Sequence, residues 1–258
     1  MPTKTAGKLV IGADNPAISP YFEPRDDGNT EPWDPQGGDP TSGKGFESGV
    51  AHAVAGELGY STENVTWIVV PFLNSFAPGP KEFDFYLSQV SYTAEREQAA
   101  DLSDGYYFVN QAVVAAKDGP FASATTVAAL KGARVGAQTA TTSLRAIEDV
   151  IQPSTQASVY DSNDAAIEAL KTGQIDAIVV DLPTAHFITK VQAPETAVVG
   201  QMTPQEGAEP EYFSLVLEKD SPLTECVNEV IRTLVDDNRL QNLADEWLDD
   251  KTVPLIGQ

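Results

Sequence analysis

The sequence has little cysteine, histidine and positive charge. Cys226 is the only cysteine, and there are 2 histidines among 258 residues. A single cysteine excludes an intrachain disulfide, and residues this sparse form no zinc-ligand spacing. Sixteen Lys and Arg stand against 38 Asp and Glu, so the formal net charge is -22. Such a charge repels phosphates, and we expect no nucleic-acid partner and no binding to an anionic membrane surface.

Long apolar runs are also missing. No run approaches the ~18 residues of a membrane span, and the opening M-P-T-K-T-A-G-K lacks the apolar core of a signal peptide. We expect any export signal to lie outside the printed sequence.

Gly38–Lys44 imitates a phosphate-binding loop, but Gly45 stands where a hydroxyl should bind Mg²⁺ and no apolar strand precedes it. We therefore expect no cofactor.

Strand and helix patterns alternate along the chain, which predicts an α/β fold. The apolar stripe of Phe46–Gly59 predicts an amphipathic helix. Ser221-Pro222 is expected to open another helix, on whose apolar stripe Cys226 is predicted to be a buried structural thiol. Glu23–Lys44 is rich in Gly, Pro and Asp and is interpreted as a long loop or hairpin insertion. The expected strands are 8–12, 66–70, 83–90, 111–116, 134–138, 175–180 and 212–217.

Polar residues follow several of these strands, where α/β proteins place ligands. Pro71–Ser75 is expected to be a loop at a strand end. Thr141–Ser143 precedes a helix and is expected to supply a cap, which is compatible with ligand binding. Asp181 ends the apolar strand 175–180, and it is either a helix cap or a carboxylate ready for a cation.

The segment 83–107 carries the most specific pattern. It begins with apolar residues at roughly two-residue spacing, and Ser91, Thr93 and Arg96 follow. Two hydroxyls and a planar guanidinium can bind a carboxylate. The alternative is an ordinary surface turn with capping hydroxyls.

The pattern F-D-x-x-x-S-x-x-S-x-T-x-E-R-x-x-x-x-D-x-S-D-x-Y-Y resembles the amino-acid-binding (family 3) solute receptors of ABC importers. L-K-G-A-R-V-G-A-Q-T-A-T-T-S and A-L-K-T-G-Q-I-D-A-I-V-V-D-L-P resemble further family motifs, and the likeness extends from Leu9 to Trp247. It implies two α/β lobes of the periplasmic-binding-protein-like type 2 fold, joined by two crossover hinge strands with the ligand cleft between them. Lobe 1 is expected to comprise 1–109 and 211–258, and lobe 2 to comprise 110–210.

The resemblance also implies roles for particular residues. Arg96 and Thr142 are expected to bind the α-carboxylate of an amino acid with support from Ser91, and Asp181 the α-ammonium group. The remaining positions, expected to line the side-chain end of the pocket, are Asp14, Ile18, Phe72 and Gln89.

Three departures from the family pattern leave the choice of amino acid open. Ile18 stands where an aromatic often stacks on the ligand, Gln89 replaces Gly or Ser, and Ala140 replaces the Gly of G-T-T. The implied function is an extracytoplasmic, monomeric binding protein that serves the membrane subunits of an ABC importer and favours polar neutral or basic amino acids. The alternatives are a cyclohexadienyl-dehydratase-like lyase, with Glu23, Glu47 or Asp14 as acid, and the ligand-binding domain of a receptor.

Overall fold

The computed structural model describes residues 2–28, 31–35, 37–203, 209–248 and 253–257. The chain forms two compact units, Met1–Phe108 with Glu211–Leu248 (unit 1) and Val109–Pro210 with Asp249–Gln258 (unit 2). The sequence prediction put the whole of 211–258 in lobe 1. Within the described C-terminal residues, however, Pro254 O accepts from Gln201 N at 2.9 Å, and Gly257 N donates to Thr125 O at 2.9 Å. These bonds attach Val253–Gly257 to unit 2.

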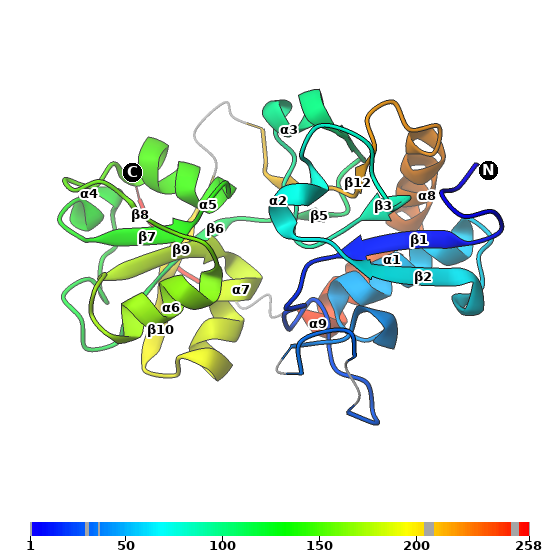
Figure 1. Cartoon of the computed structure of the whole chain (residues 1–258). Helices are drawn as coiled ribbons and strands as arrows, with labels where there is room; N and C mark the ends of the chain where they lie inside the picture. The colour runs from blue at the N-terminus through cyan, green and yellow to red at the C-terminus, as the bar shows by residue number, and fades with distance from the viewer. Residues whose placement is uncertain (1, 29–30, 36, 204–208, 249–252, 258) are drawn as a thin grey trace. The chain divides into compact units, whose positions relative to one another are not determined.

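Unit 1 is built on a five-stranded mixed sheet in the order β2-β1-β3-β12-β4 (Figure 1). β1 is parallel to β2 and β3, whereas β12 is antiparallel to β3 and β4. The parallel strands therefore end at one common edge. The strands are β1 Leu9–Ala13, β2 Val65–Val69, β3 Phe85–Tyr86, β4 Asp101–Leu102 and β12 Val216–Leu217. A separate two-stranded ribbon pairs β5 Tyr107–Phe108 with β11 Tyr212–Phe213.

The described helices of unit 1 are α1 Phe46–Glu57, α2 Phe72–Ser75, α3 Ala94–Ala99, α8 Thr224–Asp236 and α9 Arg239–Trp247, with short 3₁₀ helices η1 Pro40–Ser42 and η2 Thr62–Asn64. Helix α1 begins at Phe46, as the apolar stripe predicts. In the described part of 23–44, η1 is the one regular element and no strand forms. Arg25 Nε lies 3.0 Å from the buried Asp39 carboxylate, and Trp33 is buried. The insertion thus packs onto unit 1 without becoming a hairpin.

Unit 2 has its own mixed sheet in the order β10-β6-β9-β7-β8. β7, β8 and β9 are parallel, and β6 runs antiparallel to both β9 and β10. The strands are β6 Gln111–Ala116, β7 Val135–Gln138, β8 Ser158–Tyr160, β9 Ala177–Asp181 and β10 Thr196–Met202. The helical segments are α4 Val127–Leu130, α5 Thr142–Arg145, η3 Ala146–Ile151, α6 Asn163–Lys171, α7 Leu182–Phe187 and η4 Ile188–Gln192.

The apolar run of β9 is buried on both faces of this sheet. Ala177 and Val179 belong to one core cluster, whereas Ile178 and Val180 belong to the cluster on the opposite face. Successive side chains of a strand point to opposite faces, so a strand covered on both sides must be apolar throughout. The end of β9 is therefore rigidly placed, and it carries Asp181.

Several predicted elements differ from the observed ones. Segment 83–90 is buried except for the half-buried Gln89, but only Phe85–Tyr86 is a strand, and 212–217 is divided into β11 and β12. Pro71–Ser75 contains the one-turn helix α2 rather than a loop. Helix α8 begins at Thr224, because Ser221 Oγ accepts from Leu223 N in a preceding turn. Cys226 is half-buried rather than buried.

Candidate functional site

The strand ends of unit 1 are tied to one another by hydrogen bonds. Asp14 follows β1, and its backbone N–H donates to Ser88 Oγ after β3 at 3.0 Å. Gln89 and Ser91 come next on the same segment. The carboxyl ends of parallel strands thus gather Asp14, Gln89 and Ser91 at one edge of the sheet, as such sheets commonly do at a ligand site.

Arg96 lies at the N-terminal part of α3 and is only 7% exposed. Thr93 caps this helix by accepting from Arg96 N at 3.2 Å. The guanidinium donates from Nη1 to Ser91 O at 2.5 Å, and its central carbon lies 4.5 Å from the Phe76 ring centroid and 5.5 Å from that of Phe72. A cation held over aromatic faces is attracted by their quadrupole. The environment therefore fixes the plane of the guanidinium.

Ser91 is fixed by the chain segment 211–214, which contains β11. It forms an antiparallel bridge with Phe213, and Val90 O accepts from Ser214 N at 2.8 Å. Its hydroxyl donates to Glu211 Oε1 at 2.6 Å. Glu211 was not predicted from sequence, since 120 residues separate it from Ser91.

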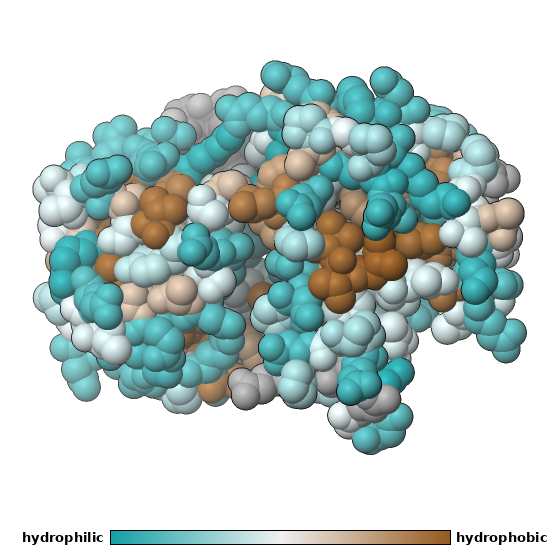
Figure 2. All heavy atoms as spheres, in the orientation of Figure 1, coloured by the Kyte–Doolittle hydropathy of each residue, from teal (hydrophilic) through white to brown (hydrophobic). Residues whose placement is uncertain are grey.

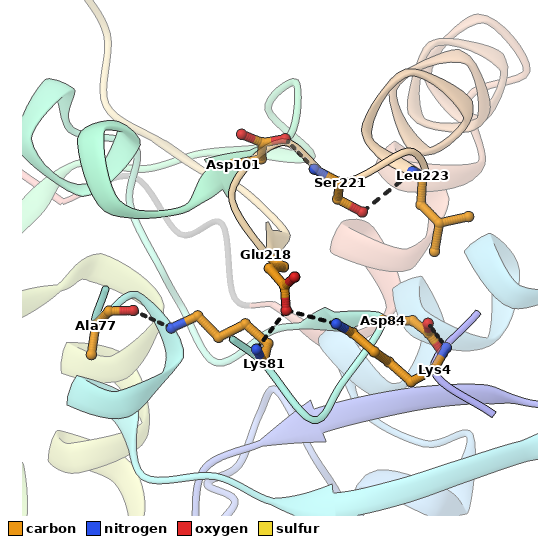
Figure 3. A network of polar contacts seen from close by, with 8 residues as sticks. All are labelled: Lys4, Ala77, Lys81, Asp84, Asp101, Glu218, Ser221 and Leu223. Carbon is orange, nitrogen blue, oxygen red and sulfur yellow. Dashed lines mark hydrogen bonds and ion pairs between the residues drawn. The ribbon is translucent and has the colours of Figure 1, made fainter. Parts of the chain in front are cut away.

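Helix α2, which supplies Phe72, is tied to the sheet through Lys81 (Figure 3). The Lys81 ammonium donates to Asn74 O at 3.1 Å and to Ala77 O. The Lys81 backbone N–H donates to Glu218 Oε2 at 2.6 Å, and Lys4 Nζ meets the same oxygen at 2.6 Å. Burial lowers the pKa of Lys81, which Glu218 partly opposes. This cation thus fixes the turn that follows Phe72.

An apolar surface is visible in Figure 2 on the part of unit 1 that carries β2 and α2. Val69 and Leu73 are exposed here by 40% and 44%. Phe72 and Phe76 are partly buried beside them, and their rings meet edge to face at 5.2 Å. Phe72 was expected to line the side-chain end of a pocket, and in the structure its ring also lies against the Arg96 guanidinium.

Glu47 in the first turn of α1 is fully buried and accepts three hydrogen bonds. Gln89 N donates to Oε1 at 2.7 Å, Gln89 Nε2 donates to Oε2, and the Tyr106 hydroxyl donates to Oε1. Burial raises the pKa of Glu47 to about 7, although each of these bonds favours the charged form. The same burial, with the neighbouring Glu47 charge, raises the pKa of Tyr106 well above its usual range, so this phenol stays a donor.

Asp14 and Ile18 occupy the loop after β1. Burial raises the pKa of Asp14, while backbone N–H groups of Asn15 and Phe72 lower it in part. The neighbouring Asn15 side chain accepts from Asp34 N at 2.8 Å, which connects the insertion to this loop. Ile18 O accepts from Tyr21 N and Phe22 N at 3.1 and 3.0 Å. Ile18 is thus part of a tight turn, and its side chain is half-buried.

In unit 2, Gln111 brings together the two predicted residues Thr142 and Asp181. The register of β6 and β9 pairs Gln111 directly with Asp181. Gln111 Nε2 donates to Asp181 Oδ1 at 2.7 Å and lies 3.4 Å from Thr142 Oγ1, and Ser143 Oγ donates to Gln111 Oε1 at 2.7 Å. The Asp181 side chain makes no capping bond to α7. The Asp181 side chain is therefore held at the strand end by Gln111 and does not cap α7.

The loop before α5 contains Ala140 with φ of 57°, in the left-handed region where glycine is favoured. Thr141, rather than Thr142, caps the helix by accepting from Leu144 N at 3.2 Å. The capping role and the proposed ligand role therefore belong to different residues. Gln89 in unit 1 also has a left-handed backbone, with φ of 50°. Two of the three departures from the family pattern, Gln89 and Ala140, thus have a left-handed backbone that is strained for a residue with a side chain.

The structure gathers the predicted site residues into two sets. Unit 1 holds Asp14, Ile18, Phe72, Gln89, Ser91 and Arg96, and unit 2 holds Thr142 and Asp181. Among the described residues, no three His, Cys, Asp or Glu side chains are placed to bind a metal ion, and no helix is long and apolar enough to cross a membrane. Gln111 and Phe76 were missed from the sequence, because neither stands in the quoted motifs.

Two α/β units, each with polar side chains at its parallel strand ends, define a two-lobed class of ligand-binding proteins. The model for bacterial extracellular solute-binding proteins, family 3, matches residues 27–250, so the chain belongs to this family. The predicted family and the two-lobed α/β fold are thereby confirmed.

Individual relatives agree with this assignment. The chain is 26% identical over 209 residues to the arginine-binding extracellular protein ArtP of Bacillus subtilis (strain 168), covering 79% of this chain and 77% of ArtP. It is 29% identical over 249 residues to the L-cystine-binding protein TcyJ of Escherichia coli (strain K12), covering 95% and 84%. The solved structure of AbpA, an amino acid ABC transporter substrate-binding protein from Streptococcus pneumoniae bound to L-arginine, matches with a TM-score of 0.73 at 25% identity, covering 95% of each chain.

Proposed function

We propose that this protein captures a free α-amino acid outside the cytoplasm and delivers it, as a monomer, to the membrane subunits of an ABC importer. The two sets of side chains are complementary to the two charges of a zwitterion. Arg96 and Thr142 bind the α-carboxylate, with Ser91 in support, and Asp181 binds the α-ammonium group. Because these residues belong to different units, the ligand favours closure of the hinge, and the closed form is the one the importer recognises.

The single observation that carries this proposal is the environment of Arg96. The guanidinium is buried, oriented by Ser91 O and flanked by two aromatic rings. Such an arrangement places a planar donor fork for bidentate binding of a carboxylate. The bond from Gln111 to Asp181 gives the second set a similarly fixed acceptor for an ammonium group.

The ligand class follows from the side chains around Asp14. An acidic ligand side chain would meet the Asp14 carboxyl group, and Gln89 and Asn74 add uncharged amides. The insertion adds no unpaired positive charge from Arg25 or Lys44 that would favour an acidic ligand, because Arg25 pairs with Asp39 and Lys44 with Asp26. The names of ArtP and TcyJ and the L-arginine bound to AbpA support a polar or basic ligand. We therefore propose polar neutral or basic amino acids, with glutamate and aspartate rejected.

A thermal-shift panel of the twenty amino acids, followed by calorimetry of the hits, tests this function. We expect stabilisation by polar neutral or basic amino acids. Stabilisation chiefly by glutamate or aspartate would overturn the proposed ligand class, and a protein that binds no amino acid would overturn the function. Native mass spectrometry of the purified protein would identify a retained ligand.

We also propose that the protein acts by binding and not by catalysis. A lyase on this fold needs a general acid in contact with its substrate. Glu47, the acid with a pKa near neutrality, is covered by Gln89 and Tyr106 and is fully buried. Incubation with arogenate or prephenate should leave both compounds unchanged, and turnover of either would refute the proposal.

A further inference from the structure

The Glu47 carboxylate fixes the orientation of the Gln89 side-chain amide. An ionised carboxylate offers only acceptors, so the amide atom that faces it must be the nitrogen. The orientation of a glutamine amide is often ambiguous, but here an acceptor-only partner decides it. Oε2 of Glu47 accepts from Gln89 Nε2, and Oε1 accepts from Gln89 N at 2.7 Å.

The backbone of Gln89 makes this arrangement specific. Its φ of 50° is unfavourable for a residue with a side chain, and such conformations persist only where surrounding contacts determine them. The two bonds to one buried carboxylate supply such contacts. They hold the main chain and the side chain of Gln89 together, so neither rotates without losing a bond to Glu47.

The amide oxygen of Gln89 is then the atom left to meet other groups. Gln89 follows Ser88, whose hydroxyl accepts from Asp14 N at 3.0 Å, and it therefore lies at the same strand-end edge as Asp14. An acceptor at this edge suits a ligand side chain that ends in N–H groups, such as an amide, an ammonium or a guanidinium. It disfavours a carboxylate, which has only acceptors to offer.

We propose that Glu47 is a specificity-determining positioning residue, which turns the Gln89 amide oxygen toward the ligand side chain and thereby selects amino acids that end in N–H donors. This inference rests on the proposed function, because it assigns the preference at the same site. It goes further by naming a buried residue that acts through Gln89 without touching the ligand.

The substitution Glu47→Gln tests this directly. The introduced amide can donate to Gln89 Oε1 and so favours the opposite orientation of the Gln89 amide. L-glutamine and L-glutamate are the probes, because they have nearly the same shape and differ in N–H donors. Calorimetry at pH 8 gives the ratio of Kd for glutamate to Kd for glutamine. We expect this ratio to fall about 10-fold or more in E47Q, as expected when a polar partner is lost.

Two further variants separate specificity from stability. The exchange E47Q/Q89E restores a carboxylate–amide pair with the carboxylate now on the ligand side, and its ratio should return to the wild-type value or exceed it. The control Y106F removes a different hydrogen bond to Glu47 and keeps both bonds to Gln89. Its ratio should stay within about 3-fold of wild type, since the amide is not reoriented.

Each outcome decides the question. Equal losses of affinity for both probes in E47Q would show that Glu47 is merely structural and would overturn the inference. Should L-glutamate bind too weakly to measure, its Kd enters the ratio as a lower limit, and should L-glutamine not bind, the tightest ligand of the amino-acid panel that ends in N–H donors takes its place. A protein that binds no amino acid would instead overturn the proposed function itself.

A second measurement uses the wild-type protein and does not depend on whether a Glu47 variant folds. In ¹⁵N-labelled wild-type protein, the Gln89 side-chain amide, assigned by its loss in Q89M, should have one N–H that exchanges slowly with water. The same signal should shift as Glu47 titrates. Rapid exchange of both amide protons would show that the bond to Glu47 does not hold the amide, and the inference would fail.

Discussion

The ionisation of Glu47 should lower the stability of the protein as the pH rises through neutrality. The pKa of this carboxyl group is 4.5 in an exposed chain and about 7 in the folded protein. The folded state therefore binds its proton more tightly than the unfolded state does. Stability from this group is fully present below pH 4.5 and is lost between pH 4.5 and about 7. Because each pKa unit is worth ~1.4 kcal/mol, the loss is on the order of 3 kcal/mol.

The assay is urea denaturation of wild type and E47Q at several values between pH 4.5 and 8. Wild type should lose on the order of 3 kcal/mol more than E47Q across this interval, because the amide does not titrate. The tyrosines around Glu47 do not mimic this effect, because Tyr86 and Tyr106 have pKa values raised well above their usual range. Asp14, whose pKa burial also raises, is present in both proteins. Parallel pH curves for the two proteins would refute the reasoning.

Four further substitutions test other parts of the two units. Arg96→Lys should weaken amino-acid binding by on the order of 100-fold in calorimetry, because an ammonium lacks the planar fork, and unchanged affinity would refute the role of Arg96. Asp181→Asn should weaken binding with an unchanged melting temperature of the empty protein, whereas lower stability with intact binding would indicate that Asp181 serves the fold through its bond to Gln111. Ala140→Gly should stabilise the empty protein by ~1 kcal/mol in urea denaturation, because glycine accepts the left-handed backbone without strain, and a destabilised variant would contradict this reason. Lys81→Met should lower both stability and ligand affinity, because the turn after α2 loses its cation, and affinity equal to wild type would show that the position of Phe72 does not depend on Lys81.

The sequence alone determined the family, the α/β class and the two motifs that carry Arg96 and Asp181. These are local features. Strand β9 is recognised in the sequence by its continuous apolar run, because it is covered on both faces of the sheet. Asp181 follows this run directly, so its place at the strand end can be predicted from the sequence. The Thr93 cap is likewise a matter of neighbours three residues apart, since Thr93 Oγ1 accepts from Arg96 N.

Only the tertiary structure decided which partners orient these residues. Gln89 meets Glu47 across 42 residues and Gln111 meets Asp181 across 70, and no local periodicity encodes such pairs. The sequence shows that Gln89 and Ala140 depart from the family pattern, but it could not show that both residues have a positive φ. The conformation of a backbone is set by the contacts around it, and the left-handed Gln89 is held by a buried carboxylate of α1 that accepts from both of its nitrogens.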